Sequence, residues 1–249
     1  MNVTRLVARQ VRYENTAFWR NPAAAFFTFA FPLIFMGIFN LVLASDQTPG
    51  AAAQFFTPAI ITFSIVNACF TSVAMTVSSA RDESVLKRVR GTPLPGWAYL
   101  VARMLQAVIV TVILVAIVIV AGRISFGVTL PLEQLPLLLV VLFLGATSFC
   151  ALGLAMAALI PNAAAAPAIV NAIVLPLYFV SDVFVQLQPD NVLAQVGNLF
   201  PIRHVADALQ SCWNPVVHPF DPMDLVVIAA WGVLGLVAAI RLFTWEPRS

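Results

Sequence analysis

The chain has 249 residues, of which 61% are hydrophobic and only 10% are charged, and its mean hydropathy is +0.95. A soluble domain of this length needs far more polar surface to cover its core, so we expect an integral membrane protein. The net charge of +2, without a basic patch interleaved with aromatic residues, excludes a nucleic-acid-binding protein.

The first segment, residues 1–21, has the pattern of an amphipathic helix lying on the membrane interface. At about 100° per residue its valines and Phe18 share one face, and its arginines share the opposite face. Glu14 falls on the apolar face, where an unpaired carboxylate is costly. It is expected either on an exposed, frayed turn or in a salt bridge with a basic residue such as Arg81 or Arg88. The arginines of this helix are Arg5, Arg9, Arg12 and Arg20.

Six apolar runs are long enough to cross a bilayer as helices, since a span needs about 20 mainly apolar residues. A helix satisfies its own backbone hydrogen bonds in lipid, and the alternation typical of membrane β-strands is absent from the sequence. We therefore predict an all-α fold with one transmembrane domain over residues 1–249. The predicted spans are 23–44, 55–78, 97–121, 135–160, 164–184 and 225–243.

The distribution of basic residues orients these spans. With six spans both termini lie on one side of the membrane, and eleven of the thirteen basic residues lie on that side. The positive-inside rule then puts both termini in the cytosol, as expected for a multi-pass protein of the plasma (inner) membrane. Only Arg123 and Arg203 fall on the outer side.

Polar residues recur along the second and fifth predicted spans. Such residues in lipid indicate close helix packing, or alternatively a substrate path or a dimer seam. Asp182 needs a partner or water, so we expect it at the outer mouth, where a cation-binding or gating role is a further hypothesis. The residues are Thr57, Ser64, Asn67, Thr71 and Ser78 in the second span, and Asn171, Tyr178 and Asp182 in the fifth.

The most highly charged passage, residues 80–95, connects the second and third spans. A serine before it can cap a short helix over residues 79–92, with acidic side chains in the first turn and basic ones in the last, as the helix dipole favours. Glu83 and Lys87, the only lysine of the chain, are spaced as an i,i+4 ion pair. Gly91 and the prolines that follow end the helix. We expect a rigid amphipathic helix on the cytoplasmic side.

This passage resembles the first cytoplasmic loop of ABC type-2 exporter permeases, the family that includes the daunorubicin-type drug exporters. The family pattern runs roughly Arg-Glu-x-Gly-Thr-Leu-Lys-Arg-Leu-Arg-x-Thr-Pro-Leu-Pro. A second likeness, over residues 179–210, is to the family's outer re-entrant helical segment, although Asp182 and Phe200 depart from that pattern. We expect that outer segment over residues 185–220. The second likeness is carried by Ser181, Val183, Phe184, Pro201, Asp207, Ala208 and Leu209.

The resemblance implies that residues 79–92 form a coupling helix, which docks on a separate ATP-binding-cassette ATPase subunit. It also implies that a second copy or a sister permease completes the pore. The sequence has no GxxxxGK[ST] motif, so ATP and Mg are expected on the partner ATPase, and no cofactor is expected on this chain. The residues expected to couple to the ATPase are Arg81, Asp82, Glu83, Leu86, Lys87, Arg88, Arg90, Thr92 and Pro93.

The expected function is therefore that of a permease subunit, without catalysis of its own, in an ATP-driven exporter of drug-like or lipid-like amphiphiles. A polysaccharide or lipid-linked glycan exporter is the alternative within the class. An ATP-independent secondary transporter or a membrane scaffold is the alternative from another class. The spacing of histidines, cysteines and carboxylates suggests neither a catalytic nor a metal site, and besides protein subunits the expected partners are membrane lipids.

Overall fold

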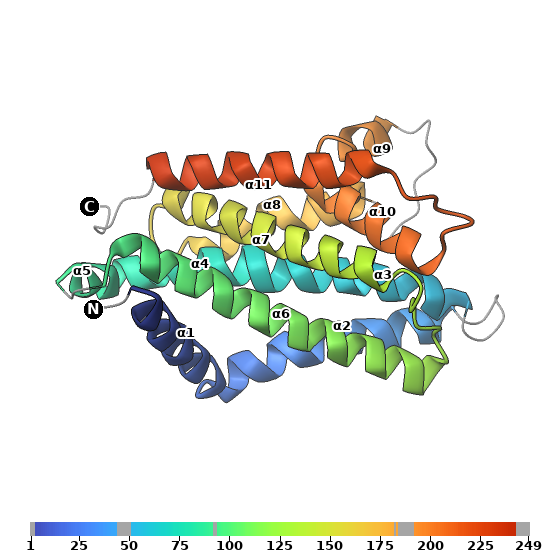
Figure 1. The fold of residues 1–249 in the computed structure, drawn as a ribbon, viewed down its shortest axis with the longest axis horizontal. Helices are drawn as coiled ribbons and strands as arrows, with labels where there is room; N and C mark the ends of the chain where they lie inside the picture. The colour runs from blue at the N-terminus through green and yellow to red at the C-terminus, as the bar shows by residue number, and fades with distance from the viewer. Residues whose placement is uncertain (1–2, 44–50, 92–93, 182, 184–191, 243–249) are drawn as a thin grey trace.

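The computed structural model describes residues 3–43, 51–91, 94–181, 183 and 192–242. Every regular element within this part of the chain is helical, and the long helices lie side by side along the long axis of the molecule (Figure 1). The α-helices are α1 (Val3–Trp19), α2 (Pro22–Leu43), α3 (Ala51–Ile65), α4 (Ser72–Asp82), α5 (Val85–Arg90), α6 (Gly96–Phe126), α7 (Leu135–Leu159), α8 (Ala166–Val180), α9 (Val192–Gly197), α10 (Pro201–Trp213) and α11 (Pro222–Leu242), and a π-helical segment, η1 (Val66–Thr71), joins α3 to α4.

Within the described residues, five helical stretches are long and apolar enough to cross a membrane, and they correspond to five of the six predicted spans. The remaining predicted span, 164–184, contains α8, which is apolar but only 15 residues long. Such a helix extends about 22 Å, less than the roughly 30 Å of a hydrocarbon core. The exact count of six spans is therefore not confirmed. The five stretches are Pro22–Leu41, Ala53–Asp82, Gly96–Phe126, Leu135–Leu159 and Pro222–Leu242.

The helix α7 lies at the centre of the bundle, between α11 on one side and η1 with α4 on the other. Glycines allow both approaches. A Cβ added at Gly153 would lie 2.8 Å from the carbonyl oxygen of Phe70, and one added at Gly235 would lie 2.8 Å from the backbone nitrogen of Leu152. Because even a methyl group would force backbones apart at these points, α7 is held by close helix packing of the kind that small residues permit in membranes.

The second predicted span is not a regular α-helix throughout. The π-helical turn of η1 interrupts it, and Gly153 of α7 packs against the carbonyl groups of Cys69 and Phe70 within that turn. The wider turn changes the angular register of every residue after it. Thr57, Ser64, Thr71 and Ser78 recur every seven residues in the sequence, but because of this turn they do not lie on one straight stripe.

A buried ion pair attaches α1 to the bundle. Glu14 and Arg103 of α6 are 3.3 Å apart, with side chains that are 10% and 7% exposed, and Gln10 donates a hydrogen bond of 2.8 Å to Glu14. The expected exposed turn and the expected partners Arg81 and Arg88 were therefore wrong. Arg103 is one of the eleven basic residues that oriented the predicted spans, and no partner was predicted for it. The three arginines of this helix, Arg5, Arg9 and Arg12, are exposed, and so is Arg20 just after it.

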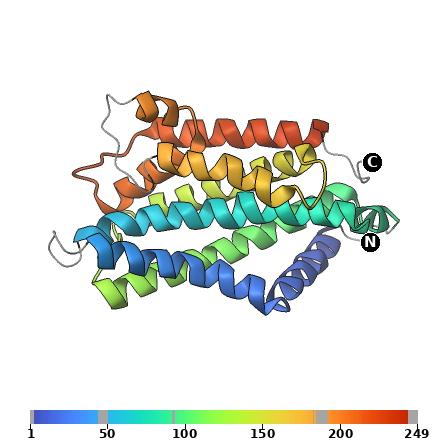
Figure 2. The same ribbon diagram turned by 180° about the vertical axis from the view of Figure 1, so that it is seen from behind.

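The two ends of the bundle differ. The start of α1, the end of α11 and the short helix α5 lie toward one end, and α9 lies toward the other (Figure 1). Seen from behind, α8 lies on the face between α11 and α4 (Figure 2).

The helix α6 is longer than predicted and ends where Gly127 adopts a left-handed conformation with φ 69°. Its amide donates to the carbonyl of Arg123 at 3.2 Å, which satisfies an otherwise unpaired helix end.

Gly153→Ala is expected to lower the stability of the folded permease by about 1–3 kcal/mol, because the new methyl group overlaps the backbone of η1. Gly37→Ala in α2 is the matched control, since nothing lies within 4 Å of its added Cβ. That control should be neutral or gain about 0.5–1 kcal/mol from the better helix former. Thermal unfolding of the two variants in the same detergent compares them, and equal midpoints would contradict the proposed packing of α7.

Single charge reversals at the α1–α6 pair, Glu14→Arg or Arg103→Glu, should each lower the unfolding midpoint strongly. Removing one partner of a buried ion pair costs about 3–5 kcal/mol. The double swap Glu14→Arg/Arg103→Glu restores opposite charges and should recover part of the loss in the same thermal assay. If the double variant is as unstable as the sum of the single variants, the pair does not hold α1.

Candidate functional site

The short helix α5 projects from one end of the bundle and is anchored there by apolar contacts (Figure 1). Leu86 is fully buried against Ala80 of α4 and Tyr99 of α6, and Val85 and Val89 pack around this cluster. The next side chains along α5, those of Lys87 and Arg88, are exposed. The helix therefore has one face fixed to the spans and a basic face open to a partner.

The start of this helix differs from the sequence expectation. We predicted one helix over 79–92, but α4 continues through Asp82, and Ser84 adopts a left-handed conformation with φ 57° before α5 begins at Val85. The amide of Glu83 donates to the carbonyl of Ser79 at 2.9 Å, which completes the last turn of α4. Asp82 and Glu83 thus belong to α4 and the turn after it rather than to the first turn of α5.

The predicted ion pair between Glu83 and Lys87 is also not seen among the described side chains. The guanidinium of Arg88 instead donates to the backbone carbonyl of Glu83 at 3.3 Å. Because the left-handed turn at Ser84 lies between Glu83 and Lys87, these two residues do not share one regular helix. Thr92, Pro93 and the side chain of Arg90 lie outside the described residues.

Arg81 is the central polar residue of this site, and only 1% of it is exposed. Its guanidinium donates hydrogen bonds to the backbone oxygens of Ala157 at 3.0 Å, Ile160 at 2.7 Å and Pro161 at 3.3 Å. The last carbonyls of a helix have no partner within that helix, and a cation is favourable beside them. Arg81 therefore caps the end of α7 from the end of α4.

Asp82 extends the same connection to the start of α8. One carboxylate oxygen lies 3.4 Å from Nε of Arg81, and the other accepts a hydrogen bond from the backbone amide of Ala163. The side chain of Asn162 accepts a further bond of 2.9 Å from the amide of Ala165 in the same connection. Arg81 and Asp82 thus connect the end of α4, from which α5 extends, to the end of α7 and to the segment that leads into α8.

The polar residues predicted for a substrate path or dimer seam occupy different environments. Thr57 and Ser64 are buried and donate to carbonyls of their own helix, at Ala53 (2.7 Å) and Ile60 (2.6 Å). Buried Tyr178 donates to the carbonyl of Phe63 at 3.3 Å, so it joins α8 to α3.

Other members of this set are accessible. Asn67 and Thr71 are half-buried in η1, and Asn171 on α8 is exposed. Ser78 is buried, and Asp182 lies outside the described residues. The structure thus brings Tyr178 to the second span, whereas Thr57 and Ser64 are satisfied within their own helix.

At the opposite end of the bundle, a histidine joins α10 to α11. Nδ1 of His204 lies 2.7 Å from a carboxylate oxygen of Asp224, and Nε2 lies 2.9 Å from the backbone oxygen of Asn198. Since a carbonyl only accepts, Nε2 must carry a proton. The hydrogen bond with Asp224 raises the pKa of His204, which favours the charged imidazolium. This contact joins the start of α10 to the start of α11.

Sequence reasoning missed the partner residues of these polar contacts. Arg103 interrupts an apolar run, a signal that could have indicated a buried ion pair, but nothing in the sequence connects it to Glu14. No group of three or more metal-ligating side chains occurs within the described residues. The cysteines Cys69, Cys150 and Cys212 are free and buried, consistent with packing residues.

Comparison with known proteins gives one family. The family model of the ABC-2 type transporter matches residues 5–212, a range that runs from α1 into α10 and includes η1 and α5. No curated protein matches the chain. The matched domain is the transmembrane component of such transporters and lacks a nucleotide-binding site, and the family implies an ABC ATPase partner in general. With its apolar helices, this chain is an integral membrane protein that belongs to the ABC-2 type transporter family as a permease subunit.

Proposed function

We propose that this permease exports drug-like or lipid-like amphiphiles across the plasma membrane, driven by a separate ATPase subunit that binds ATP and Mg. The observation that supports the proposal is the way α5 is attached to the bundle, with one face buried and the other exposed. Its buried face is fixed by Leu86, and its exposed face presents Lys87 and Arg88 at one end of the bundle. A rigid helix with a basic outer face suits docking into a complementary groove, because little ordering remains to be done on binding.

The force of ATP-driven closure needs a route from α5 into the spans. Arg81 and Asp82 supply it, since they join the segment before α5 to the end of α7 and to the connection into α8. The helix α7 in turn packs closely against η1 and α11 through Gly153 and Gly235. A displacement of α5 would therefore move several spans together, as in a rigid-body transition.

The same proposal orients the molecule and assigns its partners. Both termini and α5 face the cytosol, α8 forms a short sixth span, and α1 lies on the membrane interface with its arginines toward anionic lipid. A second copy or sister permease completes the pathway, with Asn67, Thr71 and Asn171 as the accessible polar candidates at the seam.

The nature of the cavities supports an amphiphilic cargo over a glycan. The cavities between α7, α8, α10 and α11, and between α1 and α6, are lined almost entirely by apolar side chains. A glycan exporter would be expected to present polar groups along its path, because buried sugar hydroxyls need hydrogen-bonding partners.

Reversing the exposed charges of α5, Lys87→Glu/Arg88→Glu, should weaken association with the ATPase at least about tenfold, since like charges across an interface cost several kcal/mol. Co-purification in mild detergent, followed by an ATPase assay, measures the association. Arg12→Glu/Arg20→Glu is the matched control, because Arg12 on α1 and Arg20 just after it are both exposed and the charge change is the same. Undiminished ATPase recovery with the α5 variant would contradict the docking role. A wild-type chain that recovers no ATPase would favour a secondary transporter or scaffold.

Asp82→Asn and Arg81→Gln test the route from α5 to α7. Each should leave ATPase binding in place but reduce ATP-dependent transport in proteoliposomes, because the exposed face of α5 is unchanged while its connection is weakened. Arg81→Gln should also lower stability by about 1.5–3 kcal/mol, the usual range for hydrogen bonds to a charged group. The milder Asp82→Asn keeps the test usable if Arg81→Gln does not fold. Normal transport by both folded variants would show that coupling takes another path.

A further inference from the structure

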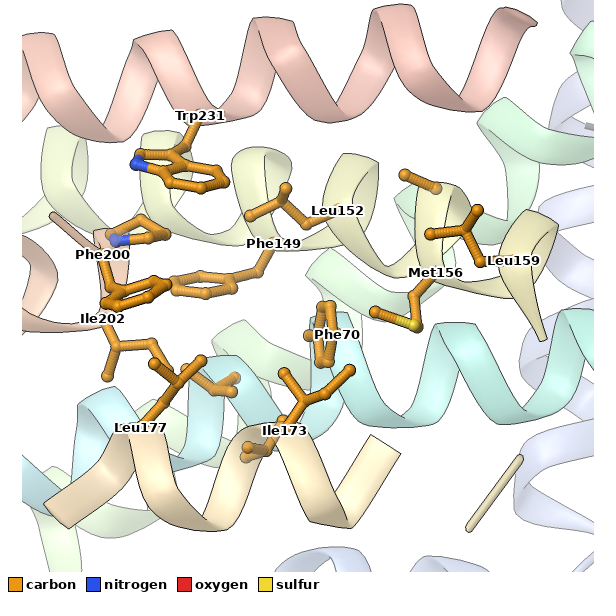
Figure 3. A pocket seen from close by; sticks show the side chains of 14 residues that line it. Phe70, Phe149, Leu152, Met156, Leu159, Ile173, Leu177, Phe200, Ile202 and Trp231 are labelled. Carbon is orange, nitrogen blue, oxygen red and sulfur yellow. The ribbon is translucent and has the colours of Figure 1, made fainter. Parts of the chain in front are cut away.

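An apolar cavity of about 240 Å³ lies between α7, α8, α11 and the start of α10 (Figure 3). Phe149, Leu152 and Met156 point into it from α7, Ile173 and Leu177 from α8, and Trp231 from α11. Its floor is fully covered, with Val66 0%, Val174 4% and Ile202 2% exposed. The cavity exists because α11 packs along α7, whereas α8 packs mainly against α4, α9 and α10, so the face of α7 between α8 and α11 is left uncovered.

The lining excludes a polar occupant. Trp231 carries the one polar side-chain N–H or O–H group among the described residues that line the cavity, and its indole nitrogen already donates to the carbonyl of Leu199 at 2.9 Å. A buried water needs about two to four polar partners, and an apolar cavity of about 150 Å³ already stays dry and takes up a benzene-sized ligand. A sugar or a charged headgroup would lose its hydrogen bonds here.

The rim shows that the cavity opens sideways. Ile173 is 37% exposed and Leu159 is 55% exposed, and both belong to the lining. Ile173 lies on α8, which the proposed topology embeds in the membrane, so hydrocarbon is the medium at its side of the opening. A void loses the dispersion contacts of its lining outright, and hydrocarbon that fills it restores them without a desolvation cost.

Size distinguishes a hydrocarbon chain from a protein helix. From Phe149 to Leu159 the cavity follows α7 for about 15 Å, half of the roughly 30 Å core and therefore the depth of one leaflet. A helix of that length, about 10 Å wide, displaces on the order of 1,000 Å³. Measured up to the surrounding atoms, the empty space is about 750 Å³, part of it open to the medium. This is less than the helix would occupy, so the cavity accommodates a single chain but not a whole span of a second copy.

We propose that this cavity is a lateral binding site for one acyl chain of a bilayer lipid. The chain enters between α8 and α11 and lies along α7, toward the end of α7 that Arg81 caps. The flexible side chain of Met156 adapts the lining to chains of different shape. The site belongs to one permease chain and needs neither ATP nor the ATPase. The proposal rests on the proposed membrane topology, but occupancy of the cavity can be measured without any transport activity.

Photocrosslinking in nanodiscs tests the site with full-length permease and any ATPase that co-purifies. The probe is phosphatidylcholine with a diazirine at the middle of one acyl chain. Adducts are located by mass spectrometry at Met156 and compared with Phe143 of the same helix, which is 64% exposed and reports ordinary lipid contact. We expect adducts at both positions in the wild-type chain.

Filling the cavity should remove only the inner adduct. Ala155→Phe places a ring in the cavity and should reduce labelling at Met156 several-fold relative to Phe143. Ala172→Phe, at an exposed position of α8 outside the lining, is the matched control and should change nothing. Ile173→Trp narrows the rim at an exposed position and gives a second test if Ala155→Phe does not fold.

Two outcomes would overturn the proposal. Absence of wild-type labelling at Met156 would mean a dry, unoccupied cavity or one covered by another protein chain. Labelling at Met156 that survives both Ala155→Phe and Ile173→Trp in folded protein would mean that the probe reaches this residue by a route other than the cavity.

Discussion

The end of α7 depends on the guanidinium of Arg81. A buried charge is expensive unless it is fully hydrogen-bonded, and here three backbone oxygens and the carboxylate of Asp82 surround it. The same contacts satisfy carbonyls that α7 itself leaves without partners. The hydrogen bonds of Arg81 thus stabilise both its own buried charge and the free carbonyl groups of α7, where α4, α5, α7 and α8 come close. These bonds help to fix the position of α5 and the path of the chain into α8.

The two sides of α7 are packed in opposite ways. Toward η1 and α11, glycines bring backbones together until there is no room for a methyl group. Toward α8 the packing is loose enough to leave a cavity. A close-packed interface transmits displacement, whereas an open one can be filled by a ligand. The helix is therefore suited to mechanical transmission on one side and to lipid contact on the other.

The apolar runs of the sequence predicted the long helices well, because membrane spans are set by local hydrophobicity. The start of α5 was not predictable in this way. It depends on bonds from Arg81 and Asp82 to residues 76 to 81 positions further along the chain. The π-helical turn of η1 was also not predicted, because assigning polar residues to one face of a span assumes a regular α-helical period.

The sequence identified the important charged residues but did not predict which of them form pairs. Glu14 was identified as needing a partner, yet Arg103 was counted only toward topology. The family likeness of residues 80–95 located the site on the chain, but it did not distinguish the buried Arg81 from the exposed Lys87 and Arg88. That distinction depends on tertiary packing, which no local pattern contains.

The residues that fix α5 to the bundle are buried, whereas its basic residues are exposed. This separation affects how the sequence of such a subunit can change in evolution. Substitutions at exposed positions usually change stability by no more than about 0.5 kcal/mol, whereas changes in a buried polar network cost much more. Lys87 and Arg88 can therefore vary at little cost in stability, whereas Leu86 and Arg81 cannot. In the proposed docking role, such variation would change the partner of α5 while the membrane core stays the same.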